Sequence, residues 1–126
     1  YTKISFLDSL TLEELCDIFS VSKLLILPSY GESFSMVAAE ASAAGLPVIA
    51  YRTGGIPTVV EHGETGFLVS PGDIQSLSDA IAKLLSNERI YLRFARAAKE
   101  RAMSWHQDIV AKQTAELYAK IIKSKF

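Results

Sequence analysis

The sequence contains one cysteine, Cys16, in its 126 residues, so no disulfide forms within the chain. A lone cysteine also leaves a cysteine-based zinc site without its other ligands. Cys16 lies in the segment Leu15-Cys16-Asp17-Ile18, which predicts a buried structural thiol rather than a reactive one. The composition is compatible with a reducing compartment, and we expect a cytoplasmic protein.

Long apolar runs and an excess of one charge are also missing. No stretch approaches the length of a membrane-spanning helix, and the start shows no basic-then-apolar leader pattern. The net charge of −1 and the lack of a basic run argue against nucleic-acid binding. The apolar content of 49% is typical of a folded domain, and the length fits a single one. Because the chain starts at Tyr1 without an initiator Met, we expect it to be part of a longer protein.

The first part of the chain predicts a strand, a helix and a second strand. Ile4–Leu7 is short, apolar and β-prone. Thr11 and Glu14 form a capping-box pattern, which predicts a helix that starts at this point. The run Leu24–Leu27, ended by Pro28, is typical of a strand buried on both faces of a parallel sheet.

The following segments complete a strand-helix-strand crossover. An alanine-rich helix is expected from about Ser35 to Ala44, where Gly45 ends it, and Val48–Ala50 is the next strand. Further along we expect a helical turn at 56–60, a strand at 67–69, and helices at 74–85, 89–103 and 108–123. The fold class is therefore α/β, a Rossmann-like parallel sheet with flanking helices. Residues 1–126 form one domain with a helical tail from about residue 88.

Two loops occupy the usual place for a ligand, at the carboxyl ends of the strands: Pro28–Phe34 and Tyr51–Gly55. The helix start after the first loop offers unpaired amides and partial positive charge, which suit a diphosphate. The carboxylates of Glu32 and Glu40 accept hydrogen bonds from pairs of hydroxyls. A ligand with a central diphosphate and a diol at each end, such as a nucleotide sugar, fits this pattern.

The segment Pro28–Ala41, PSYGESFSMVAAEA, resembles the Glu-x7-Glu signature of retaining glycosyltransferases with the two-domain GT-B architecture, of the family 4 or group 1 type. Weaker matches occur at Trp105 and Tyr118, so that the resemblance covers almost the whole chain. It implies the incomplete carboxyl-terminal domain of such an enzyme. The other matching segments are residues 45–50, 54–57, 61–69 and 71–73.

The resemblance also implies roles for individual residues. Glu32 would take the catalytic position and face the hydroxyls of the donor sugar, while Glu40 would bind the ribose hydroxyls. The remaining donor-binding residues would be Ser33, Phe34, Ser35, Met36, Val37, Gly54 and Gly55. Gly54-Gly55 is open to two interpretations: a turn that needs positive φ, or a close approach of backbone to the substrates. His62 and His106 are interpreted as surface residues without a metal partner, and Trp105 as an anchor for the last helix.

The enzyme implied by the resemblance transfers a hexosyl group, such as mannosyl or glucosyl, from a UDP-, GDP- or ADP-sugar to a glycan or a lipid-linked acceptor. It needs no metal or other cofactor. An amino-terminal domain, absent here, would bind the acceptor, supply an Arg and a Lys for the diphosphate, and contact the cytoplasmic face of the membrane. Alone, the present chain is expected to be inactive. Two alternatives remain: a non-catalytic nucleotide-sugar-binding subunit, or a GT-B phosphorylase or epimerase.

Overall fold

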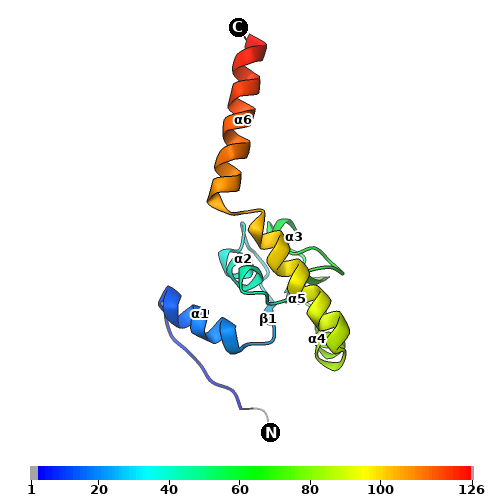
Figure 1. Ribbon diagram of the computed structural model, residues 1–126. Helices are drawn as coiled ribbons and strands as arrows, with labels where there is room; N and C mark the ends of the chain where they lie inside the picture. Colours follow the sequence, from blue (N-terminus) through cyan, green and yellow to red (C-terminus); the bar gives the residue numbers. More distant parts are fainter. Residues whose placement is uncertain (1–2, 126) are drawn as a thin grey trace.

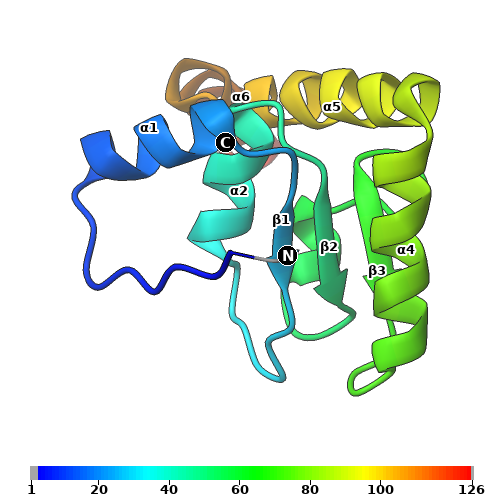
Figure 2. The ribbon, with the colours of Figure 1, turned by 90° about the horizontal axis from the view of Figure 1, so that it is seen from below.

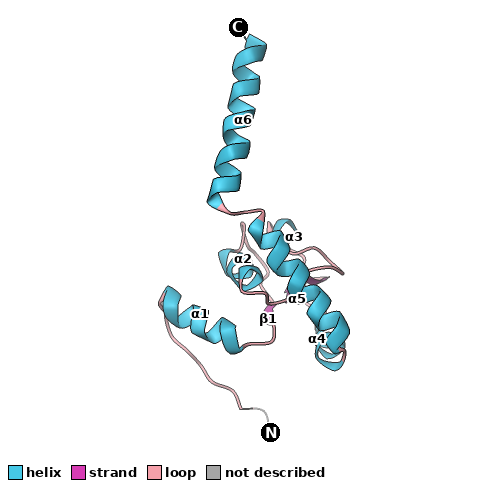
Figure 3. Cartoon of the chain, in the orientation of Figure 1, coloured by secondary structure: helices cyan, strands magenta, loops and turns pink. Residues whose placement is uncertain are grey.

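The computed structural model describes residues 3–125 (Figures 1 and 3). Helices and strands alternate along the chain through residue 69, and helices follow. This order confirms the predicted α/β class. The elements are α1 (Leu12–Val21), β1 (Leu25–Leu27), α2 (Met36–Ala43), β2 (Val48–Tyr51), α3 (Ile56–Val59), β3 (Gly66–Val69), α4 (Ile74–Ser86), α5 (Glu88–Met103) and α6 (Gln107–Lys125).

The three strands form one parallel sheet in the order β1-β2-β3. Leu25 lies opposite Val48, which lies opposite Gly66 on its other side. Since β1 and β2 are parallel neighbours joined through α2, the predicted crossover unit is confirmed. All residues of the central strand β2 are buried.

Helices cover both faces of the sheet (Figure 2). Val48 and Ala50 of β2 belong to a core cluster with residues of α2 and α3, whereas Ile49 packs with Leu84 of α4 and Phe94 of α5. This alternation follows from the two-residue period of a strand, which sends successive side chains to opposite faces. The result is the layered arrangement expected of a Rossmann-like unit.

The predicted double-sided burial of the first sheet strand is wrong. β1 starts at Leu25, and Ile26 is 39% exposed. Within the described residues β1 pairs only with β2, so it lies at an edge of the sheet. An apolar run indicates a strand, but its burial depends on neighbours that the run does not specify.

The strand predicted at Ile4–Leu7 is also wrong. This segment has no regular structure, and Phe6 is 95% exposed. In the described part of the chain no backbone hydrogen bond joins it to the sheet, and a β-prone segment becomes a strand only when a partner edge is available. Tyr1, where the chain starts, lies outside the described residues.

The predicted helix ends are confirmed. The Glu14 amide donates to Thr11 Oγ1 over 3.2 Å, and the Thr11 amide donates to Glu14 Oε2 over 2.7 Å. Gly45, with φ of 78°, follows the C-cap Ala44 of α2. These local signals fix where each helix begins or ends because they involve residues only a few positions apart.

The two last helices differ in their surroundings. α5 packs against α2 and α4 and buries Phe94 and Ala98, so it is an integral part of the layered body. α6 points away from the body (Figure 1), and residues 107–124 are all exposed. Across residues 3–125, every helix is too short or too polar to cross a bilayer.

Candidate functional site

The loops after β1 and β2 meet at the carboxyl edge of the sheet, as parallel pairing requires. The Thr53 hydroxyl donates to the Ser29 carbonyl over 2.9 Å. The Gly55 amide donates to the Glu32 carbonyl over 3.1 Å. The two loops predicted to bind the ligand are therefore bonded directly to each other, and Thr53 is a contact that the sequence did not indicate.

The two glycines make this contact possible. A β-carbon at Gly54 would lie 1.7 Å from the Glu32 carbonyl oxygen, and one at Gly55 would lie 1.7 Å from the Ser33 carbonyl oxygen. Gly54 has a positive φ of 50°, whereas Gly55 has a φ of −84°. The interpretation as a turn with positive φ thus applies to Gly54. Both glycines also approach the backbone of the neighbouring loop closely, whereas an approach to the substrates stays a prediction.

The helix α2 starts with an unusual backbone conformation at Ser35. This N-cap residue has φ of 72° and is 5% exposed. Among the described residues it is the one non-glycine residue with positive φ. This conformation costs about 1–3 kcal/mol, persists only where the surrounding structure enforces it, and is found most often at functional sites. Its Oγ accepts a hydrogen bond from the Ala38 amide over 3.4 Å.

The first turn of α2 presents free donors. The Ala38 and Ala39 amides donate to Ser35, but within residues 3–125 no hydrogen bond involves the Met36 or Val37 amide. Unpaired amides at a helix start attract an anion, and the helix dipole adds to this attraction. The geometry at this point can hold a phosphate group without a side-chain cation.

The side chains around this helix start differ in what they touch. Met36 is 64% exposed, and Val37 is partly buried and packs against the core. The Phe34 ring packs edge-on against the Trp105 ring, with centroids 6.4 Å apart. Glu32 is half-buried, and Ser33 is exposed beside it.

Glu40 lies one turn into α2, about 6 Å along the axis from Met36. It lines a groove of about 460 Å³ between α1 and α2. The other lining residues are Leu12, Leu15, Cys16, Phe19, Ser20, Ala43 and Ala44. Within the described residues the carboxylates of Glu32 and Glu40 make no hydrogen bond or ion pair, so both can accept from a ligand.

The groove also corrects a prediction. Cys16 is exposed, not buried, and Phe19 is the only buried residue of α1. α1 therefore rests on the body through one face of its carboxyl-terminal half. The residue pattern of α1 indicated an apolar face, but not how much of that face is covered.

Arg101 is a second contact that the sequence did not indicate. From the end of α5 its guanidinium donates to the carbonyls of Val59 and Thr58 and to the Glu61 carboxylate, over 3.1, 2.9 and 3.0 Å. It also lies 5.9 Å from the centre of the Trp105 ring. Since more than forty residues separate Arg101 from these carbonyls, no local pattern identifies the contact.

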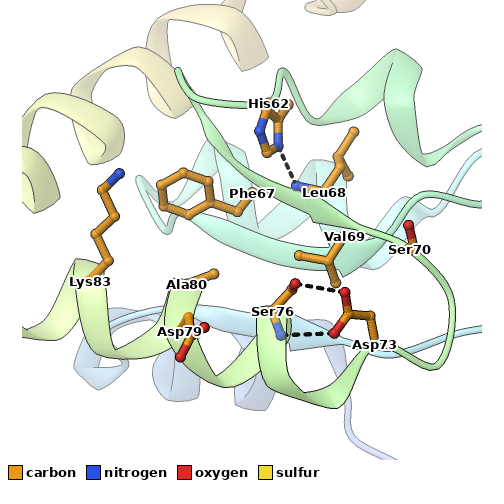
Figure 4. A pocket seen from close by; sticks show the side chains of 10 residues that line it. All are labelled: His62, Phe67, Leu68, Val69, Ser70, Asp73, Ser76, Asp79, Ala80 and Lys83. Atoms are coloured by element: carbon orange, nitrogen blue, oxygen red, sulfur yellow. Dashed lines mark hydrogen bonds between the residues drawn. The ribbon is translucent and has the colours of Figure 1, made fainter.

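A separate hollow of about 420 Å³ lies between β3 and α4 and contains none of the predicted site residues (Figure 4). His62 Nδ1 accepts a hydrogen bond from the Leu68 amide, as in a structural turn. Hydrogen bonds from the Ser76 hydroxyl, the larger cause, and from the Ser76 amide hold the pKa of Asp73 below its ordinary value. These polar groups are engaged within the protein, so they do not mark the hollow as a ligand site.

Comparisons with known proteins give the family. The family model "Glycosyl transferases group 1" matches residues 2–101. A D-inositol 3-phosphate glycosyltransferase of Corynebacterium efficiens is 39% identical over 118 residues, which are 94% of this chain and 28% of the relative. The chain thus spans less than a third of that relative's length.

Solved structures agree. Sucrose-phosphate synthase of Thermosynechococcus elongatus matches with a TM-score of 0.82 and 32% identity over 95% of this chain and 30% of its own. HepE of Anabaena, in a complex with UDP-glucose, matches with a TM-score of 0.72 and 31% identity over 85% of this chain and 30% of its own. These neighbours show the carboxyl-terminal domain of the GT-B architecture. The chain belongs to the group 1 glycosyl transferases.

Proposed function

We propose that this chain is the donor-binding part of a retaining glycosyltransferase and that it holds a nucleotide-diphospho-sugar at the start of α2. The observation that carries the proposal is the turn at Ser35, which leaves the Met36 and Val37 amides free at the carboxyl edge of the sheet. The diphosphate lies there, where the helix dipole favours a negative charge.

The two carboxylates recognise the parts of the donor on either side of the diphosphate. Glu40, one turn into the helix and free of protein partners in the described structure, accepts from the ribose hydroxyls. Glu32, in the loop before the helix, accepts from the hexose hydroxyls and stabilises the positive charge that develops on the sugar. Gly54 and Gly55 contribute by fixing the backbone of Glu32 and Ser33 rather than by touching the donor.

For the whole protein we propose an activity that extends the family assignment. The enzyme transfers a hexosyl group to a glycan or lipid-linked acceptor, and an amino-terminal domain supplies the acceptor site and the cations for the leaving diphosphate. The retaining course rests on the resemblance around Glu32 and Glu40. We expect no metal cofactor, because the helix start takes its place, and a cytoplasmic location with membrane contact through the other domain. The present chain alone is predicted not to turn over.

An amide NMR titration of the chain with UDP, GDP and ADP tests the donor site. We expect shifts centred on the Met36 and Val37 amides with the matching nucleotide. UDP is the first choice, since HepE was solved with UDP-glucose. Glu40→Ala should weaken binding of any nucleotide about tenfold or more, because it removes a charged partner of the shared ribose. Glu32→Ala should leave UDP binding unchanged and remove only the additional affinity of UDP-glucose.

Glu100→Ala, a change at an exposed glutamate on α5, is the matched control and should bind like the wild type. Shifts centred on the hollow between β3 and α4, or equal affinities of Glu40→Ala and the wild type, would refute the proposed site. If Glu32→Ala weakens UDP and UDP-glucose equally, the assignment of Glu32 to the sugar is wrong.

A further inference from the structure

We infer that Arg101, in the last turn of α5, and Trp105, just after α5, are positioning residues that set the geometry of the donor-binding loops. The inference rests on the proposed function, because it concerns the same helix start and the same loops. Neither residue touches the donor. They act through two contacts, one on α3 and one on Phe34.

The first contact fixes α3 at its carboxyl end. Arg101 donates to the carbonyls of Thr58 and Val59, two of the groups that a helix end leaves unpaired. The positive charge also suits the negative end of the helix dipole. A planar guanidinium with donors in a fixed fork holds both carbonyls in one orientation, which a lysine does not reproduce.

Fixing the end of α3 also fixes its beginning. The helix has four residues, so its axis is about 6 Å long, and Gly55 is its N-cap. Gly55 in turn donates to the Glu32 carbonyl. A displacement at Thr58 or Val59 therefore passes through one rigid turn to the backbone of the residue that we assign to the sugar.

The second contact reaches the other end of the same loop. The guanidinium lies 5.9 Å from the Trp105 ring centre, within the range of a cation–π interaction. Trp105 packs edge-on against Phe34, directly before the helix cap Ser35. Arg101 thus supports the donor loop at two points, through α3 and through Trp105. The ion pair with Glu61 is partly exposed and adds little by itself.

The test compares Arg101→Gln with two control variants of the same chain. Arg96→Gln changes an exposed arginine of the same helix and should behave as the wild type. Leu84→Ala removes a buried side chain from the cluster between the sheet, α4 and α5, which lowers stability without touching these contacts. We expect Arg101→Gln to weaken UDP-glucose binding about tenfold and Leu84→Ala to leave the affinity of the folded chain unchanged.

A ligand-free measurement separates this inference from the proposed function. Hydrogen exchange of the Gly55 amide should become about tenfold faster in Arg101→Gln. The Ile49 amide in the central strand should keep its rate. The NMR contact between the Phe34 and Trp105 rings should weaken as well. Trp105→Phe should preserve UDP-glucose binding, because a phenylalanine keeps the aromatic contact with Phe34. Trp105→Leu should weaken UDP-glucose binding, because a leucine loses that contact.

Three results would overturn the inference: an unchanged Gly55 rate in Arg101→Gln, unchanged UDP-glucose affinity in that variant, or an equal loss of affinity in Leu84→Ala. If the wild-type chain binds none of UDP, GDP, ADP and UDP-glucose, the proposed function fails. The support of the loop by Arg101 is then decided by the Gly55 exchange rate and the Phe34–Trp105 contact alone.

Discussion

Gly55→Ala should destabilise the chain through steric overlap, without any strain in the backbone dihedral φ. The native φ of Gly55 is −84°, which alanine adopts without strain. Its β-carbon, however, would lie 1.7 Å from the Ser33 carbonyl oxygen, half of the 3.4 Å at which ordinary contact begins. The two loops must move apart, and the bond from the Gly55 amide to Glu32 is lost. Overpacking and the lost bond together cost about 2–4 kcal/mol.

Three other glycines separate the causes. Gly63 has φ of 83° and nothing near its β-carbon position, so Gly63→Ala measures the backbone cost alone, about 1 kcal/mol. Gly54 combines positive φ with a contact of 1.7 Å and should give the largest loss. Gly31 has neither feature, and Gly31→Ala should change stability by less than about 0.5 kcal/mol.

The assay is urea denaturation followed by circular dichroism, with the four alanine variants and the wild type measured side by side. A domain of this size has a total stability of about 5–15 kcal/mol, so the expected differences are measurable. Amide spectra should place the changes of Gly55→Ala at Glu32, Ser33 and their neighbours. The reasoning is refuted if Gly55→Ala is as stable as Gly31→Ala, or if it costs no more than Gly63→Ala.

Three further predictions concern the helix start, the core and a helix cap. Ser35→Gly should be more stable than Ser35→Ala by about 1 kcal/mol, because both lose the side-chain cap but only alanine retains the strain of positive φ; thermal unfolding of the pair decides this. Leu84→Ala should cost about 2–5 kcal/mol in urea denaturation, since Leu84 is fully buried against Ile49 and Phe94; a loss below 1 kcal/mol would place it outside the core. Asp73→Asn should be less stable than the wild type at neutral pH. Hydrogen bonds from Ser76 hold the pKa of Asp73 below its ordinary value, so its stabilisation is present above the unfolded-state pKa and is lost as pH falls through the folded-state pKa. A difference between the two proteins that persists unchanged in strong acid would contradict this.

The sequence alone determined the order of the elements from α1 onward and which two loops meet at one edge of the sheet. The capping box at Thr11 and Glu14, the glycine after α2 and the apolar run before Pro28 are signals within a few residues, and each was found where the pattern placed it. Parallel pairing then follows from the strand-helix-strand spacing. This pairing brings the two predicted loops to one edge of the sheet.

Only the tertiary structure decided which surfaces are covered and which distant groups meet. The same kind of apolar run forms a strand at β1 but an exposed segment at Ile4–Leu7. In α1, Cys16 is exposed although its apolar neighbours predicted that it would be buried. The glycine pair proved to serve a contact between loops, and Arg101 meets carbonyls more than forty residues away. Periodicity and capping describe a residue relative to its neighbours along the chain. Burial and long-range hydrogen bonds depend instead on which elements pack together, and that is fixed only when the whole chain folds.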